Sequence, residues 1–344
     1  MVFNFICPDL DRPVGGVKVL YKHCEFLVDH GIRSYIFHPK RRDIKGAFFK
    51  ARRKLGLLSH HNFLGKGQNF SCSWFQHKAA VRRNTEKGFD RESDILVIPE
   101  TYAALIGEQA VEFDFKYVIY VQNGYLIDSG VEEIGHKRLS VIYEKAKFVV
   151  SFCEDITAGI RLAYPNVNSD KILHVSPHLS PLFHPGQKEK LITYMPRKLA
   201  DHSKKILFFL KNHLPEDWRI EPIDKLAEEQ VAEILSRSSI FMSFCNQEGC
   251  ALPPLEAAAS GNLVVGYTGE GTKEYFRQPL FREVHNGDFH VFVREVLLAI
   301  EQVSSNLLFL TVSQTNEITA LTRRYSNERE VRKLVSAFQE IMNS

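Results

Sequence analysis

Residues 240–274 limit the fold of this chain more than any other part of its sequence. An apolar run leads into a loop that carries Glu248, and two consecutive prolines follow, which fit only the first turn of a helix. We expect that helix from about Leu252 to Ser260, with a second apolar run at 263–267 after it. A strand, a loop, a helix and a strand in this order are typical of an α/β unit with a parallel sheet.

The loop and the helix start of this unit have the chemistry for a ligand that contains a phosphate and a sugar. Free backbone N–H groups and the positive end of the helix dipole suit a phosphate. The carboxylates of Glu248 and Glu256 suit the hydroxyl groups of a sugar or a ribose instead. Either glutamate taken alone is most simply a solvated surface group, but Glu256 lies among leucines, prolines and alanines, where a charged group usually has a partner.

The rest of the chain continues the α/β pattern over two domains. A length of 344 residues exceeds one ordinary core. Strands are expected at 2–8, 34–38, 95–99, 117–122, 148–152, 172–175, 191–194, 206–210, 240–244 and 263–267. We place an N-terminal domain at 1–185, with an irregular excursion at 39–91. A C-terminal domain follows at 186–326, and a last helix at 327–344 is expected to pack back across the domains. The segment 176–190, which contains three prolines, is interpreted as the linker.

Composition describes an ordinary soluble protein. Hydrophobic residues make up 44% and charged residues 25% of the chain. The six cysteines form no C-x-x-C pair, which indicates reduced thiols rather than a disulfide framework or a zinc site. No signal peptide or transmembrane run is apparent. We therefore expect a cytoplasmic protein, with peripheral attachment to the inner face of the membrane as an open alternative.

That alternative depends on a basic block at 40–91, which holds 14 Lys and Arg against 3 Asp and Glu. One interpretation is a solvated, partly disordered excursion. A second is an anionic membrane surface bound through 40–58, where apolar side chains stand among eight cations (Phe48, Phe49, Leu55 and Leu58). Nucleic-acid binding is the least favoured interpretation, because no known binding module surrounds the block, and we expect no nucleic-acid partner.

The stretch E-G-C-A-L-P-P-L-E-A-A-A-S-G, with its glutamates at 248 and 256, resembles the E-x7-E donor-site signature of retaining glycosyltransferases of the GT-B fold. Among these enzymes, the stretch is most similar to glycosyltransferase family 4. The resemblance implies two facing, doubly wound Rossmann-like domains with an interdomain cleft. It also implies transfer of a sugar, with retention, from a nucleoside-diphosphate sugar to a hydroxyl of a glycan or a lipid-linked saccharide.

The resemblance also implies roles for particular residues. Glu256 would bind the donor ribose, and Glu248 would lie by the donor sugar. The backbone of Cys250, Ala251 and Leu252 would face the sugar and phosphate. The diphosphate would be held by Gly15 and Gly16, ahead of the first helix, and by the cations Arg197 and Lys198.

We expect no cofactor and no metal, because no D-x-D pair has further ligands near it. Asp9-Leu10-Asp11 spells the tripeptide, but in the first loop of the other domain.

The chain departs from the family pattern after the strand at 117–122. Many family members carry a histidine there, whereas this chain has Gln122 and Asn123. With Glu100, these residues are candidates for the acceptor side, although Asn123 followed by glycine is also an ordinary turn signal. The alternatives to a transferase are a non-catalytic glycan- or nucleotide-binding protein of the same fold and a nucleotide-sugar epimerase or hydrolase. The donor sugar, its base and the acceptor stay open.

Overall fold

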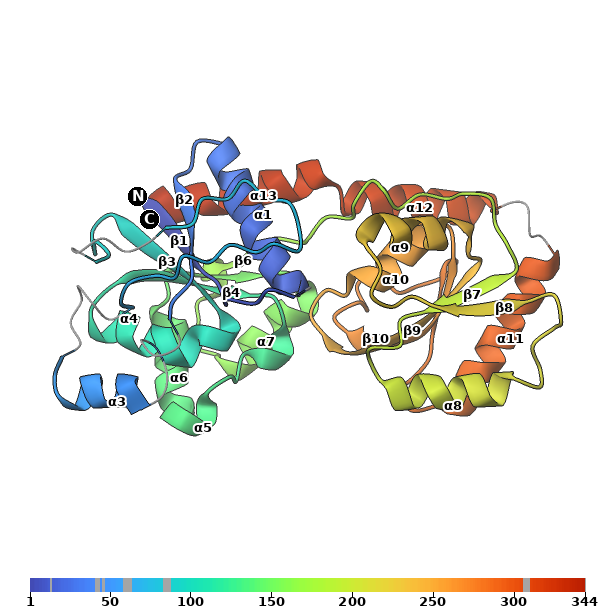
Figure 1. Cartoon of the computed structure of the whole chain (residues 1–344), viewed down its shortest axis with the longest axis horizontal. Coiled ribbons are helices and arrows are strands. Elements are labelled where there is room, and N and C mark those ends of the chain that lie inside the picture. Colours follow the sequence, from blue (N-terminus) through green and yellow to red (C-terminus); the bar gives the residue numbers. More distant parts are fainter. Residues whose placement is uncertain are drawn as a thin grey trace. The chain divides into compact units, whose positions relative to one another are not determined.

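A computed structural model of the chain describes residues 1–12, 14–40, 44, 47–57, 64–82, 88–305 and 310–343, and of residues 48, 49, 52 and 53 only the backbone. The chain forms two compact units. Unit 1 comprises Met1–Val175 with Val331–Ser344, and unit 2 comprises Ser176–Glu330. Each unit is built on one parallel sheet (Figure 1). Among the described residues, no helix is long and apolar enough to cross a membrane.

Unit 1 contains a parallel sheet of six strands in the order β2-β1-β3-β4-β5-β6. Its strands are β1 (Val2–Ile6), β2 (Ser34–Phe37), β3 (Asp94–Pro99), β4 (Lys116–Val121), β5 (Phe148–Ser151) and β6 (Ile172–His174). Its helices are α1 (Gly15–Asp29), α3 (Ala47–Lys54), α4 (Glu108–Glu112), α5 (Val131–Ile134), α6 (His136–Lys145), α7 (Glu154–Ala163) and most of α13 (Asn327–Asn343). The order reverses between β1 and β3, and ligands of open α/β sheets bind at such switch points.

The two faces of this sheet are covered by different helices. The ring of Phe338 in α13 lies 4.8 Å from the ring of Phe3 and 5.7 Å from that of Phe5, both in β1. On strand β4, Tyr117 donates a hydrogen bond of 2.6 Å to the carbonyl of Ile142 in α6. Strands β1, β3, β4 and β5 are almost entirely buried on both faces, which is why they read as continuous apolar runs in the sequence.

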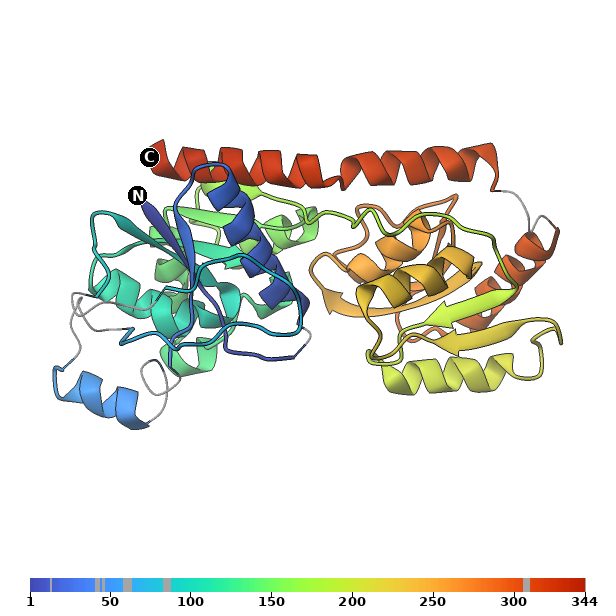
Figure 2. The same cartoon turned by 45° about the horizontal axis from the view of Figure 1, so that its top comes forward.

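Unit 2 contains a parallel sheet of five strands in the order β11-β10-β9-β7-β8. Its strands are β7 (Leu191–Tyr194), β8 (Arg219–Pro222), β9 (Ile240–Glu248), β10 (Leu263–Glu270) and β11 (Phe281–Glu283). Its helices are α8 (Ala200–Leu210), α9 (Glu228–Arg237), α10 (Leu252–Ala259), α11 (Phe289–Ser305) and α12 (Val312–Arg324). Helices α9, α10 and α12 cover one face and α8 and α11 the other (Figure 2). Here the switch point lies between β7 and β9.

The expected strand at 206–210 is wrong, because these residues end helix α8. Ile206 and Leu210 are buried, whereas Phe208 is 74% exposed, so burial follows the period of a helix. A short apolar run alone does not distinguish the two structures. The second strand of the unit is β8 instead, an edge strand with charged residues, which is why the sequence gives little sign of it.

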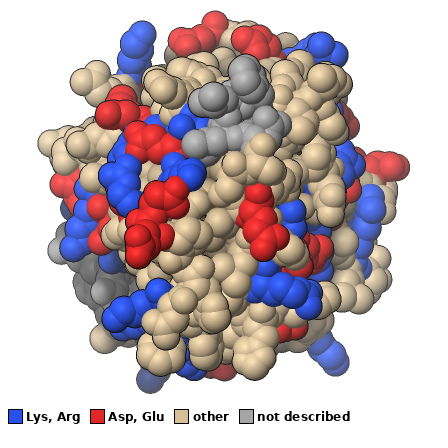
Figure 3. Space-filling model, turned by 90° about the vertical axis from the view of Figure 1, so that its right-hand side faces the viewer, with Lys and Arg blue, Asp and Glu red and all other residues tan. Residues whose placement is uncertain are grey.

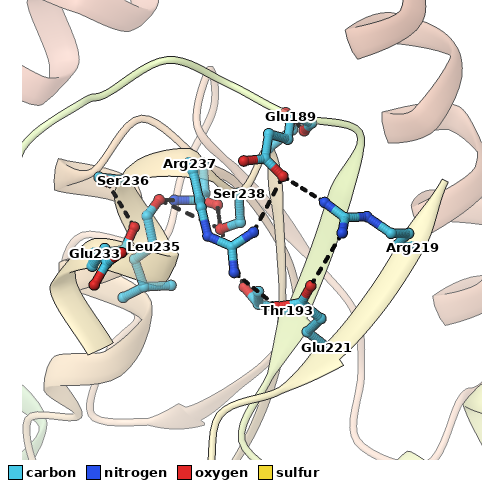
Figure 4. Close-up of polar contacts among 11 residues, drawn as sticks. Glu189, Thr193, Arg219, Glu221, Glu233, Leu235, Ser236, Arg237 and Ser238 are labelled. Carbon is cyan, nitrogen blue, oxygen red and sulfur yellow. Dashed lines mark hydrogen bonds and ion pairs between the residues drawn. The ribbon is translucent and has the colours of Figure 1, made fainter. Parts of the chain in front are cut away.

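A network of four charged side chains fixes this edge of the sheet (Figure 4). Arg237, at the end of α9, contacts Glu189 at 3.2 Å and Glu221 at 2.9 Å. Arg219 contacts the same two carboxylates, at 2.6 Å and 3.8 Å. Each exposed pair contributes only about 0.2–1 kcal/mol, but together they hold β8 beside β7. Both signs of charge are interspersed on the face in Figure 3, outside its grey atoms, so this face has no single-sign field.

Candidate active site

Gly15 and Gly16 open helix α1 of unit 1, and Gly16 contacts the residues that follow β4. A Cβ on Gly16 would lie 2.7 Å from Oε1 of Gln122, and Nε2 of Gln122 donates to the carbonyl of Gly16 at 3.2 Å. Gln122 therefore packs directly on the backbone of the first turn of α1. The N-cap of that helix, Val14, makes no side-chain capping bond. The start of α1 thus has the form of an anion site at the switch point of this sheet.

Glu100 lies beneath this region and holds the loop after β4. Its side chain is 4% exposed and accepts hydrogen bonds from the backbone N–H of Gln122 at 3.3 Å and of Asn123 at 3.1 Å. Burial raises the pKa of Glu100 to about 7. Asn123 in turn accepts a bond from the N–H of Tyr125 and caps a short 3₁₀ turn. The structure thus brings Gly16, Glu100, Gln122 and Asn123 into one hydrogen-bonded group.

In unit 2, Lys198 and Glu248 form an ion pair across the switch point. Lys198 follows β7 and Glu248 is the last residue of β9, so two neighbouring strands bring opposite charges together. The side chain of Lys198 is 44% exposed and that of Glu248 is 17% exposed. Burial lowers the pKa of Lys198, since the ammonium loses part of its hydration. Arg197 beside it is exposed.

Gly249, which follows Glu248 at the end of β9, packs closely against the turn after β10. A Cβ on Gly271 would lie 1.3 Å from the carbonyl oxygen of Gly249, so only glycine fits at position 271. Gln247, with φ 48°, and Glu270, with φ 72°, both have left-handed backbones. Residues without glycine's freedom hold such conformations only where the surroundings impose them, often at functional sites. Local strain thus marks the end of β9, where Glu248 lies.

Helix α10 begins beside this loop, as the two prolines predict. Its N-cap, Ala251, makes no side-chain capping bond, and the carbonyl of Ala251 accepts a hydrogen bond from the buried hydroxyl of Tyr275. Glu256 is half-buried in the helix, between Leu255 and Ala257, which are fully buried. The positive end of α10 therefore lies next to the loop of Glu248.

A second set of contacts, absent from the sequence analysis, holds the far end of the same turn. The side chain of Glu274 is 4% exposed and accepts a hydrogen bond of 2.5 Å from the hydroxyl of Tyr325. Arg324 donates to the Glu274 carbonyl at 3.1 Å and contacts the carboxylate at 3.3 Å. Tyr325 and Glu274 are 51 residues apart, and nothing in the sequence pairs them.

Within the described ranges, no group of three or more His, Cys, Asp or Glu side chains is arranged to hold a metal ion. The absence of a metal therefore stays a prediction.

No protein-family model matches the chain. The chain is 24% identical over 262 residues to an alpha-1,6-glucosyltransferase of Actinobacillus pleuropneumoniae serotype 7, which covers 72% of this chain and 76% of that protein.

Among solved structures, sucrose-phosphate synthase of Thermosynechococcus elongatus is similar with a TM-score of 0.64 at 12% identity, over 99% of both chains. HepE of Anabaena, solved with UDP and with UDP-glucose, is similar with TM-scores of 0.63 and 0.62 at 9% identity, over 100% of both chains.

These likenesses and the two parallel sheets confirm the prediction of the GT-B fold, with two Rossmann-like domains. The sequence relative is a glucosyltransferase and the structural neighbours are glycosyltransferases, so both comparisons agree with an enzyme of the glycosyltransferase class. The assignment to family 4 and the roles given to individual site residues stay predictions.

Proposed function

We propose that this protein is a GT-B glycosyltransferase that moves a hexose from a nucleoside-diphosphate sugar to a hydroxyl of a glycan or a lipid-linked saccharide, without a metal and with retention. One observation carries the proposal: the Lys198–Glu248 pair lies at the switch point of the unit 2 sheet, beside the uncapped start of α10. A fixed cation, helix N–H groups and a carboxylate for hydroxyls are what a sugar diphosphate requires.

The proposed chemistry uses these groups to stabilise the leaving group. As the bond between the sugar and the diphosphate breaks, negative charge grows on the diphosphate. Preorganised cations and N–H groups lower the barrier because they need no reorganisation at that moment. We assign this role to Arg197, Lys198 and the first turn of α10. For Gly15 and Gly16, the first residues of α1, contact with the diphosphate stays the role that the resemblance implies. Glu256 binds the ribose and Glu248 the donor sugar, and we assign no covalent nucleophile.

UDP-glucose is the first donor to test, because the sequence relative is a glucosyltransferase and the HepE structures contain UDP and UDP-glucose. The experiment incubates the protein with UDP-, GDP-, dTDP-, ADP- and CMP-linked sugars and a panel of gluco-oligosaccharides, and measures both nucleotide release and chain extension. Extension with one donor supports the transferase. Nucleotide release without extension, or a change of donor configuration, supports the hydrolase or epimerase. Silence with every donor, together with no nucleotide-induced rise in Tm, overturns an enzymatic role and leaves the binding protein.

The membrane hypothesis for 40–58 stays a proposal. Leu58 and the side chains of Phe48 and Phe49 lie outside the described residues, whereas Leu55 is 69% exposed after helix α3. Sedimentation with vesicles of neutral and of anionic lipid tests it, and binding that does not depend on anionic lipid contradicts it. A cytoplasmic location, with or without this attachment, is likewise proposed.

A further inference from the structure

A group of aromatic side chains in unit 1 has no role in the donor site. It lies in segment 68–82, part of the basic block, and the structure holds this segment at both ends beside β2. The N–H of Gln68 donates to the carbonyl of His38 at 2.8 Å, and the N–H of Arg82 donates to that of Ile36 at 2.8 Å. This part of the block is therefore hydrogen-bonded to the edge of the sheet at both of its ends.

Two rings of the segment pack on Tyr21 of helix α1 and a third packs on one of them, and we call Trp74, Phe75 and His77 the aromatic group. The Trp74 and Phe75 ring centroids are 4.4 Å apart. The ring of Tyr21, from α1, lies 5.4 Å from Phe75 and 4.4 Å from His77, and it is fully buried. Trp74, Phe75 and His77 are only half-buried. Tyr21 thus forms the floor of a small aromatic surface that is partly open to solvent.

Two carboxylates attach this surface to the loop between β1 and α1. Oδ1 of Asp11 accepts from the N–H of Ser73 at 3.1 Å and from its hydroxyl at 2.8 Å. Oδ2 of Asp9 accepts from Nε2 of Gln68 at 2.9 Å. This loop leads into Gly15 and the start of α1, so the aromatic group lies at the carboxyl end of β1, where ligands of this fold bind.

We propose that the aromatic group stacks on a sugar ring of the acceptor, while Asp11 and Ser73 bind its hydroxyls. This inference rests on the proposed glycosyltransferase activity. An aromatic face flanked by a few polar groups is the usual lining of a site for a ligand that is apolar on one side and polar at its edge. A carboxylate has about four acceptor positions, so the bonds to Ser73 leave Asp11 the capacity to accept more.

Charge and hydrogen bonding favour a sugar over an anionic lipid at this surface. Asp9 and Asp11 are both exposed next to the rings and would repel lipid phosphates. Nδ1 of His77 makes no hydrogen bond within the described part of the chain, and it is shielded from solvent. A sugar hydroxyl supplies a partner for such an atom when the ring turns on binding, whereas lipid tails do not. The indole of Trp74 instead forms a hydrogen bond with the side chain of Cys72.

Fluorescence tests sugar binding at this surface, because the chain has only two tryptophans, Trp74 and Trp218. Trp218 is 4% exposed in unit 2, and a Trp218→Phe variant makes Trp74 the sole emitter. The probe is the gluco-oligosaccharide that the turnover assay identifies as an acceptor. We expect its addition to shift or quench the Trp74 emission in a saturable way. Unchanged emission at concentrations that saturate turnover overturns the proposal.

Kinetics test the stacking itself. Trp74→Ala is expected to raise the acceptor KM about tenfold, which is the upper range for one aromatic contact, and to change the donor KM much less. Trp74→Phe should restore most of the affinity. Phe208→Ala, which removes an exposed aromatic side chain in unit 2, is the matched control and should alter neither constant.

The remaining outcomes separate this inference from the proposed function. Equal changes in both KM values for Trp74→Ala, or no change in the acceptor KM, contradict a stacking role. Loss of sedimentation with anionic vesicles in Trp74→Ala, with the acceptor KM unaltered, assigns the surface to lipid and overturns the inference. A wild-type protein that turns over no donor refutes the glycosyltransferase itself, whatever Trp74 does.

Discussion

The switch points of the two sheets are built with the same topology but with different chemistry. In unit 2, a lysine after one strand pairs with a glutamate at the end of its neighbour, where the strand ends hold left-handed non-glycine residues. In unit 1, the corresponding place holds a glycine turn against the neutral side chain of Gln122, with the buried Glu100 beneath it. Under the proposed function, unit 2 would supply fixed charge for a diphosphate, whereas unit 1 would supply backbone and neutral groups.

The largest expected effect comes from removing the cation of unit 2. Lys198→Met should lower kcat/KM for the donor about 10²–10³-fold, since it removes one preorganised group that stabilises the leaving diphosphate. Lys204→Met, an exposed lysine on α8, is the matched control and should change kcat/KM little. A Lys198 variant as active as the control would mean that fixed charge is not what distinguishes the two switch points.

The next largest effect is expected in unit 1, where the stability of the folded protein should depend on pH. The folded-state pKa of Glu100 is raised to about 7, so the folded protein binds a proton that the unfolded chain loses near pH 4.5. The stabilising contribution of Glu100 to the free energy of unfolding is therefore present at low pH. It is lost as pH rises from about 4.5 to 7, by up to about 3 kcal/mol. Urea unfolding across this range should show the slope in the wild type and lose it in Glu100→Gln. Parallel profiles for the two proteins would contradict a buried, perturbed Glu100.

The backbone contact in unit 2 gives a third test. Gly271→Ala places a Cβ on the carbonyl of Gly249 and should destabilise the protein by about 1–3 kcal/mol, with weaker nucleotide binding because the loop of Glu248 must move. Gly159→Ala is the control in unit 1, where a Cβ meets no atom within 4 Å and the site is helical. That change should leave stability equal or slightly raised. Equal unfolding midpoints for both variants would show that the two loops do not hold each other.

Much of the fold could be predicted from the sequence, because strands buried on both faces appear as unbroken apolar runs. The strands at 240–244 and 263–267 and the helix opened by two prolines were predicted this way. The run at 206–210 failed because five apolar residues fit either a strand or a helix end. The edge strand β8 has charged residues held by Arg237 and Glu189, and that pairing exists only once the chain is folded.

The candidate site was predicted in its local parts only. Glu248 and the start of α10 lie within one motif, so their proximity follows from spacing. The contact between Gly16 and Gln122 joins residues 106 apart, and that between Asp11 and Ser73 joins residues 62 apart. No periodicity relates such positions. The aromatic group lies within the basic block at 40–91, but its neighbours Asp9 and Asp11 come from outside that block, so the sequence does not relate them.

The smallest expected effect tests whether the Glu274 contacts belong to the donor site of unit 2. Tyr325→Phe removes one hydroxyl that donates to Glu274, while Arg324 still holds the carboxylate. We therefore expect the turn to lose about 1.5 kcal/mol of hydrogen-bond free energy. If the turn that ends at Glu274 positions Glu248, this loss should appear as a rise in the donor KM with kcat retained. Tyr275→Phe removes a hydroxyl that holds Ala251, at the start of α10, and should act in the same direction. A lower Tm in Tyr325→Phe with an unaltered donor KM would confine these contacts to stability and leave the ion pair as the basis of the site.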